Sequence, residues 1–287
     1  MPETFLVEAR RLLHQYGIRP SRRLGQSFLV DPGVLELILK EACLGPEEVI
    51  VEIGPGLGAL TQGLARKAAF VLAVEIDERL CRILREAFRE EGRVSVIHAD
   101  ALKCDFETYL RGRTRGKVKV VANIPYSITT PLLTRLISLP HLFSSLLVMV
   151  QKEVAARMLA MPGGKDYGSF SVYIQYYTDV HLLAEVPREA FYPRPGVDSS
   201  LVRLDIRASP RIKVRDEVLF FKLVRAAFGQ RRKTLRNALL AHPALIQDPR
   251  KLDHALAVAG ILPKRRGETL DLEDFGRLYG SLFGLHK

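Results

Sequence analysis

The chain has 287 residues, and its 43 basic and 32 acidic side chains give a formal net charge of +11. Its three cysteines lie far apart, without disulfide or zinc-ligand spacing, so we expect no disulfide and no metal site. The N-terminus has no signal-peptide core and the most apolar run, 142–150, is too short to span a bilayer, so we expect a soluble cytoplasmic protein without membrane contact.

The N-terminal region combines two predicted helices with a basic loop between them. Apolar residues at helical spacing predict a helix over 3–16, and Asp31-Pro32 predicts the capped start of a second helix over 32–42. The loop between them carries Arg22 and Arg23, which are candidates for RNA contact. A solvated linker explains the same arginines equally well.

The middle of the chain alternates short apolar strands with helices, which predicts an α/β fold with a parallel sheet covered on both faces. Residues 169–180 are rich in aromatic and β-branched side chains and are compatible with a strand or a helix. An alternating strand over 199–206 is expected to close the sheet in antiparallel fashion. The other strands are predicted at 49–53, 70–75, 94–98, 118–122 and 144–150, and the helices at 59–67, 78–90, 131–138 and 152–160.

Beyond residue 208 the sequence predicts only helices, so we expect a domain of 1–207 and a small helical domain of 208–287. The helices are predicted at 216–228, 231–240, 249–260 and 271–283. The first two carry a basic cluster that is suited to gripping RNA phosphates, although a solvated face is the plainer alternative. The candidate RNA-binding residues there are Arg231, Arg232, Lys233 and Arg236.

A glycine turn follows the strand over 49–53 and precedes a helix, a layout that brings a nucleotide-like ligand close to the backbone. Its glycines are Gly54, Gly56 and Gly58. This Gly-x-Gly-x-Gly spacing differs from the Gly-x-Gly-x-x-Gly of dinucleotide-binding dehydrogenases, and no Lys-Ser/Thr follows to favour a nucleoside triphosphate. A tight turn without any ligand is the alternative.

Two acidic residues follow the second and third strands, at the edge where open α/β sheets bind their ligands. Glu75 is placed to accept both hydroxyls of a ribose, and Asp100 to accept from the exocyclic amine of an adenine. With the glycine turn they predict a pocket for an adenosine without phosphates. S-adenosylmethionine is the common cofactor of that shape, so we expect a methyl donor.

The stretch 123–126 follows the fourth strand and has the groups needed to hold a flat base with an amino group. The side-chain oxygen of Asn123 and the main-chain carbonyl of Ile124 can accept the two N–H bonds of an adenine or cytosine amine. Pro125 stiffens the turn, the ring of Tyr126 can stack on the base, and Phe191 can cover its other face. An Asx-type turn after a strand is the structural alternative.

Taken together, these motifs resemble those of the KsgA family of small-subunit rRNA adenine dimethyltransferases, and the resemblance extends over almost the whole chain. The matching stretches are 23–29, 51–58, 75–77, 100–101, 123–126, 151–154, 191–199 and 228–234.

The resemblance implies a class I, Rossmann-like methyltransferase sheet followed by a small all-helical domain. It implies transfer of methyl groups from S-adenosylmethionine to N6 of two adjacent adenines near the 3′ end of small-subunit rRNA, late in assembly of the immature small subunit. It also implies cofactor contacts from Ser27, Leu29, Gly54, Glu75, Asp100 and Asn123. The family usually has Asn where this chain has Ser27. A serine can still form a hydrogen bond, but its side chain reaches less far toward the cofactor.

Three other readings compete with this one. The related erythromycin-resistance methyltransferases modify one adenine of large-subunit rRNA, but the stretches at 191–199 and 230–234 favour the small-subunit enzymes. A non-catalytic RNA-binding assembly factor on the same fold conflicts with the intact stretch at 123–126 and the intact cofactor motifs. A dehydrogenase lacks support from the glycine spacing. Nothing in the sequence requires more than a monomer.

Overall fold

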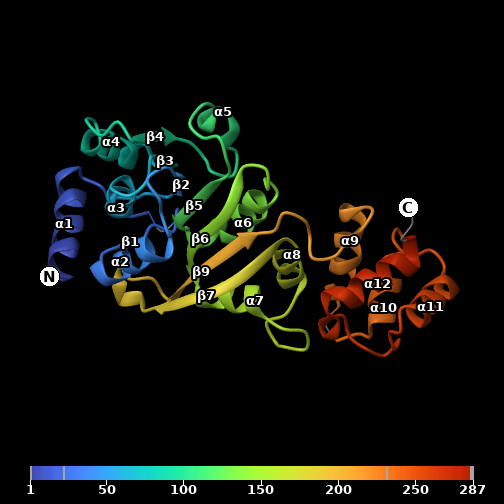
Figure 1. Cartoon of the computed structure of the whole chain (residues 1–287). Coiled ribbons are helices and arrows are strands. Elements are labelled where there is room, and N and C mark those ends of the chain that lie inside the picture. Colours follow the sequence, from blue (N-terminus) through green and yellow to red (C-terminus); the bar gives the residue numbers. More distant parts are fainter. Residues whose placement is uncertain (1, 22, 231, 285–287) are drawn as a thin grey trace. The chain divides into compact units, whose positions relative to one another are not determined.

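The computed structural model describes residues 2–21, 23–230 and 232–284, and the chain divides into two compact units. The first unit consists of Met1–Ala155 and His181–Ile206. The second consists of Ala156–Val180 and Arg207–Lys287 (Figure 1). Each unit has its own hydrophobic core.

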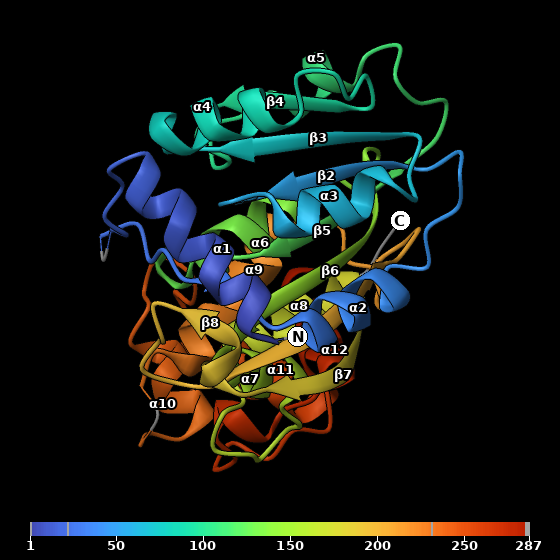
Figure 2. The same ribbon diagram turned by 90° about the vertical axis from the view of Figure 1, so that its left-hand side faces the viewer.

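The first unit is built on a sheet of order β4-β3-β2-β5-β6-β9-β7, whose first five strands run parallel (Figure 2). Strand β9 pairs antiparallel with β6, as the sequence predicts, and the expected α/β fold is confirmed. The strands are β2 (Val49–Ile53), β3 (Phe70–Glu75), β4 (Val94–His98), β5 (Val118–Asn123), β6 (Phe143–Gln151), β7 (Thr178–Val186) and β9 (Ser199–Ile206).

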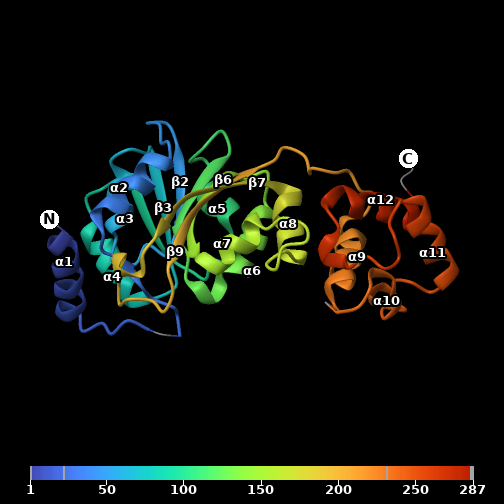
Figure 3. The same cartoon turned by 90° about the horizontal axis from the view of Figure 1, so that it is seen from below.

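Helices cover both faces of this sheet, with α2 and α3 on one side and α5 and α6 on the other (Figure 3). Apolar side chains of α2 and α3 pack with Ile50, Val71 and Val121 of three neighbouring strands. Asp31 caps α2 through its side chain, as predicted, and Asp77 caps α4 in the same way. The helices are α1 (Pro2–Gln15), α2 (Pro32–Glu41), α3 (Ala59–Ala65), α4 (Glu78–Ala87), α5 (Phe106–Leu110), α6 (Thr129–Ile137) and α7 (Lys152–Leu159).

A second, two-stranded sheet joins distant parts of the first unit. Strand β1 (Phe28–Leu29) pairs antiparallel with β8 (Phe191–Tyr192), which follows the short 3-10 helix η2 (Arg188–Ala190). A further 3-10 turn, η1 (Tyr126–Ile128), links β5 to α6. The loop before α2 and the loop before β9 are therefore fixed side by side.

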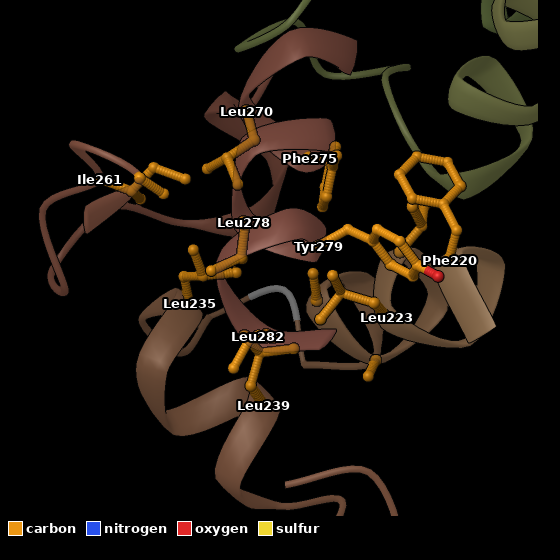
Figure 4. Packing of buried hydrophobic residues seen from close by; sticks show 14 of the residues in the cluster. Phe220, Leu223, Leu235, Leu239, Ile261, Leu270, Phe275, Leu278, Tyr279 and Leu282 are labelled. Carbon is orange, nitrogen blue, oxygen red and sulfur yellow. The ribbon is translucent and has the colours of Figure 1, made fainter. Parts of the chain in front are cut away.

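The second unit is mainly helical, and its core packs leucine and other aliphatic side chains with aromatic rings such as Phe220, Phe275 and Tyr279 (Figure 4). Helix α8 contributes Tyr176 to this core, and Tyr176 and Tyr177 both donate from their hydroxyls to Glu217 of α9, at 3.1 and 2.5 Å. These bonds tie α8 to the helices that follow β9. The helices are α8 (Ser169–Tyr177), α9 (Glu217–Phe228), α10 (Leu235–Leu240), α11 (Pro249–Val258) and α12 (Leu272–Phe283), with the 3-10 turn η3 (Gly267–Thr269).

Three local expectations need revision. The aromatic-rich segment after residue 168 is helix α8, which leads directly into β7, a strand that the sequence did not reveal beyond residue 180. Helix α5 was not predicted. The helix expected over 231–240 begins at Leu235, because Thr234 is its N-cap, so the basic residues before it lie in a turn. Among the described residues, no helix is long and apolar enough to cross a membrane.

Candidate active site

The first unit has a pocket at the carboxyl ends of the parallel strands, where ligands of open α/β sheets bind. The space between its lining atoms, including the open mouth, is about 1020 Å³. Five segments line it, namely 24–29, 52–57, 74–76, 99–101 and 123–126. The pocket thus brings together the glycine turn, both acidic strand ends and the stretch predicted to hold a base.

The glycine turn allows the chain to bend sharply beneath a ligand. All three predicted glycines have positive φ, with +70° at Gly54, +61° at Gly56 and +87° at Gly58. A Cβ at Gly56 would lie 2.9 Å from the ring of Phe28, and one at Gly58 would lie 2.9 Å from Leu84 of α4. Gly54 and Gly56 line the pocket, whereas Gly58 packs against α4 outside its lining.

Glu75 ends β3 with a buried carboxylate that faces the glycine turn. One of its oxygens accepts the main-chain N–H groups of Ile76 and Asp77, each at 2.9 Å, and the other accepts that of Gly56 at 3.3 Å. Burial raises the pKa of Glu75, and these three bonds oppose the shift. The carboxylate is thereby held rigidly in the pocket wall, where ribose hydroxyls can donate to its remaining lone pairs.

Asp100 lies half-buried after β4 and also lines the pocket. Its Oδ1 accepts the main-chain N–H of Leu102 at 2.9 Å, which orients the carboxylate. Asp100 and Glu75 are acceptors, and the donors on an adenosine are its ribose hydroxyls and its amine. The pocket therefore fits the adenosine part of S-adenosylmethionine by the chemistry of its donor and acceptor groups.

Glu52, which no sequence pattern pointed to, lies in β2 before the glycine turn and lines the pocket. The residue is 1% exposed, and its Oε2 has no hydrogen-bond partner among the described residues. Burial raises the pKa of Glu52 to about 8. Glu52 therefore places a neutral carboxyl group in the pocket wall, with one oxygen that no described residue binds.

We expect Glu52→Gln to flatten the pH dependence of stability. The native state keeps a proton on Glu52 that the unfolded chain loses above its ordinary pKa, so this group lowers the free energy of unfolding as pH rises toward about 8. The expected loss is roughly 2–3 kcal/mol between about pH 5.5 and 7.5. Urea denaturation without cofactor measures it, with the exposed Glu47→Gln as control. Parallel pH profiles for Glu52→Gln and the wild type would contradict this assignment.

Asn123 ends β5, and its side-chain amide is oriented by the loop before α2. Its Nδ2 donates to the main-chain carbonyl of Ser27 at 3.1 Å. Because the nitrogen is engaged in this way, Oδ1 is left as an acceptor in a residue that lines the pocket. The next residue, Ile124, donates its N–H to the carbonyl of Met149 at 3.2 Å and also lines the pocket.

Pro125 and Tyr126 complete the turn. Pro125 has φ −55° and packs near the glycine turn, since a Cβ at Gly54 would lie 3.6 Å from its Cδ. The hydroxyl of half-buried Tyr126 is 2.7 Å from Oγ of Ser199, a fully buried residue at the start of β9. Burial raises the pKa of Tyr126, so the ring carries a neutral hydroxyl that is anchored at its far end.

Phe191 and Leu29 are paired across the two-stranded sheet. Leu29 lines the pocket, but Phe191 is 4% exposed and packs in the core with side chains of α2 and α3. Phe191 is not part of the pocket lining, so its ring has to be uncovered before it can stack on a base. Its stacking role stays a prediction that requires a local movement.

Gln26 and Asp77 form a link that sequence patterns did not suggest. Nε2 of Gln26 donates to Asp77 at 2.9 Å, and Arg79 binds the same carboxylate. The bonds from Arg79 lower the pKa of Asp77 to about 2. The segment 24–29 is thus attached to the turn after β3 and forms part of the pocket wall.

The predicted RNA-binding residues differ in their availability. Arg22 and Arg231 lie outside the described residues, and Arg23, Arg232 and Lys233 are exposed. None of these three forms an ion pair with a described residue. Arg236 instead binds both oxygens of Asp253, at 2.6 and 2.9 Å, so its guanidinium is already occupied.

Comparison with known proteins gives one consistent relationship. A family model described as "Ribosomal RNA adenine dimethylase" matches residues 18–274. Ribosomal RNA small subunit methyltransferase A of Moorella thermoacetica is 47% identical over 277 residues, covering 94% of this chain and 95% of that protein. The protein of the same name from Clostridium botulinum is 42% identical over 279 residues, covering 97% of this chain and all (100%) of that protein.

Two solved structures share the fold of most of the chain. A dimethyladenosine transferase from Plasmodium falciparum superposes with a TM-score of 0.71 at 28% identity, covering 86% of this chain and 94% of its own. The 23S rRNA methyltransferase ErmE superposes with a TM-score of 0.66 at 27% identity, covering 89% and 99%. The family match spans most of the sequence and the sequence relatives align over nearly their full length. The chain therefore belongs to the ribosomal RNA adenine dimethylase family.

Proposed function

We propose that this chain transfers methyl groups from S-adenosylmethionine to N6 of two adjacent adenines near the 3′ end of small-subunit rRNA, giving dimethyladenosines. Its substrate is the immature small subunit late in assembly, and it acts as a monomer in the cytoplasm. Residues 1–207 carry the catalytic function, although 156–180 pack in the helical unit, and residues 208–287 carry the RNA-binding function. Methyltransferase activity on ribosomal RNA follows from the family, and the site, substrate position and timing are our proposal.

One observation carries the proposal. The acidic strand ends that suit an adenosine and the stretch that suits a target base line the same pocket, and the amide nitrogen of Asn123 is engaged by Ser27. The amide oxygen is therefore the group that Asn123 offers to a ligand. Glu75, Asp100, Gly54 and Gly56 all line this pocket, which supports their proposed role in binding the cofactor.

The cofactor supplies an electrophilic methyl group on a sulfonium. The amine of adenine is a weak nucleophile because its lone pair is delocalised into the ring. Asn123 Oδ1 and the Ile124 carbonyl accept its two N–H bonds, which directs the lone pair away from them. Pro125 fixes the turn and Tyr126 supplies a ring face, so the protein contributes mainly position. A strong general base is unnecessary, because the alkylated amine readily loses its proton to water.

The comparisons also bear on the choice of ribosomal subunit. The sequence relatives at 42–47% identity are named for the small subunit, whereas ErmE, at 27% identity, is named for 23S rRNA. Their greater similarity supports the small-subunit substrate. A non-catalytic assembly factor would not need an intact pocket with its acceptor groups in place.

The test is to incubate the protein with labelled S-adenosylmethionine and small subunits that lack adenine methylation, and then to map modified bases by mass spectrometry. We expect two adjacent dimethyladenines near the 3′ end of the small-subunit rRNA. Large subunits and naked small-subunit rRNA serve as parallel substrates. Methylation of large subunits alone supports the erythromycin-resistance reading, and binding without methylation supports the assembly-factor reading.

A further inference from the structure

Ser27 joins three segments of the active site that are distant in sequence. Its main-chain carbonyl accepts from Nδ2 of Asn123 at 3.1 Å, and its Oγ donates to the carbonyl of Pro193 at 2.6 Å. The first contact spans 96 residues and the second 166. Ser27 is half-buried and lines the pocket.

The contact with Asn123 bears on how that side chain can act. The last torsion of an asparagine is broad and roughly two-fold, so its amide can turn over and exchange oxygen for nitrogen. In the observed orientation the nitrogen donates to Ser27 and the oxygen remains an acceptor. The reversed amide would set its oxygen against the Ser27 carbonyl, where two acceptors repel, and would offer the target amine a donor instead.

The Ser27 carbonyl can orient the amide only if its own position is fixed. On one side, the hydrogen bond from the Ser27 hydroxyl to Pro193 fixes the position of the Ser27 carbonyl. The neighbouring residue Phe28 pairs with Tyr192, which holds the same two segments together. On the other side Gly25 lies close to the turn, since a Cβ there would be 3.5 Å from the nitrogen of Tyr126. The loop before α2 is thus held between the Asn123 turn and the loop after β8.

We propose that Ser27 is a positioning residue for methyl transfer: its carbonyl holds the Asn123 amide with the oxygen toward the target amine, and its hydroxyl fixes that carbonyl to the loop at Pro193. This inference rests on the proposed function. It also gives Ser27 a role other than direct cofactor contact, because its hydroxyl hydrogen is already committed to Pro193.

The role has a specific consequence for the second methylation. An unmodified adenine offers two N–H bonds, to Asn123 Oδ1 and to the Ile124 carbonyl. A monomethylated adenine offers only one N–H bond, so it has fewer ways to be held correctly. A poorly oriented Asn123 amide therefore impairs the second transfer more than the first, and monomethyladenine accumulates.

The experiment compares Ser27→Ala with Ser27→Thr, which retains the hydroxyl, in the full-length protein. Single-turnover reactions with undermethylated small subunits are followed by mass spectrometry, and S-adenosylmethionine affinity is measured separately by calorimetry. For Ser27→Ala we expect about a 5- to 10-fold higher ratio of mono- to dimethyladenine, in the range expected for losing one positioning hydrogen bond, with cofactor affinity within about twofold. Ser27→Thr should restore the wild-type ratio.

Ser138→Ala is the matched control, because the hydroxyl of this exposed serine also donates to a main-chain carbonyl, at 2.7 Å, outside the pocket. It should leave the ratio unchanged. Melting temperatures verify folding, and Ser27→Cys, with a weaker donor of similar size, replaces the alanine variant if that one unfolds.

Two results would overturn the inference. One is a wild-type product ratio in Ser27→Ala, and the other is weakened cofactor binding with an unchanged ratio, which indicates direct cofactor contact. Failure of the wild type to methylate small subunits would instead refute the proposed function.

Discussion

Replacement of Asn123 by alanine should lower the rate of methyl transfer by at least about 1000-fold, the scale seen when a positioned transition-state contact is lost. The substitution removes the acceptor for one N–H bond and the donor that binds Ser27. S-adenosylmethionine should still bind at least weakly, because Glu75 and Asp100 are untouched although the cofactor contact implied for Asn123 is lost. Single-turnover methylation of small subunits measures the rate, and calorimetry measures the affinity.

The companion variant Asn123→Asp separates the two functions of the amide. It keeps oxygen acceptors but cannot donate to the Ser27 carbonyl, so its rate should fall between those of the wild type and Asn123→Ala. A melting temperature near that of the wild type shows that any loss concerns the site. Normal turnover by Asn123→Ala would remove this residue from the mechanism.

Local sequence patterns predicted the parts of the fold that depend on neighbouring residues. Apolar runs such as 49–53 became buried strands, because a parallel strand covered on both faces needs no polar side. Asp31 was recognised as a helix cap, since a cap depends on its own side chain and the next turn.

The sequence left the structure open where distant packing decides it. Tyr173, Tyr176 and Tyr177 have high strand propensity, so the segment was compatible with a strand or a helix. They form helix α8, which lets them pack on aromatic rings of α9. Strand β7 begins immediately after this helix and includes exposed polar residues, which weakens its apolar signal.

The site shows the same division. The sequence placed Glu75, Asp100 and Asn123 together because each lies at or just after the carboxyl end of a parallel strand, and these ends share one edge of the sheet. The bonds from Ser27 to Pro193 and from Tyr126 to Ser199 join residues 166 and 73 positions apart. No local pattern encodes them. The ion pair of Arg236 with Asp253, 17 residues away, was likewise not foreseen, and the role of Arg236 in RNA binding stays a prediction.

The second large effect is expected in the exposed basic turn before α10, and it concerns affinity for small subunits. Changing both Arg232 and Lys233 to glutamate should weaken binding to small subunits by about 10- to 100-fold at physiological salt. Both side chains are exposed, and neither forms an ion pair with a described residue, so they are free to contact phosphates. The slope of log affinity against log salt concentration should become shallower by roughly 1.4 to 1.8, because two phosphate contacts are lost.

The control must carry the same change in net charge. Arg250 and Lys251 are also exposed, lie in the same helical unit and stand at the start of α11, so changing both to glutamate is a matched control. Filter binding or sedimentation with small subunits across a salt series compares the two pairs. If Arg232 and Lys233 contact phosphates directly, their double variant should lose far more affinity for small subunits than the control. Equal losses would mean that only overall charge matters, and no loss would make the turn a solvated surface.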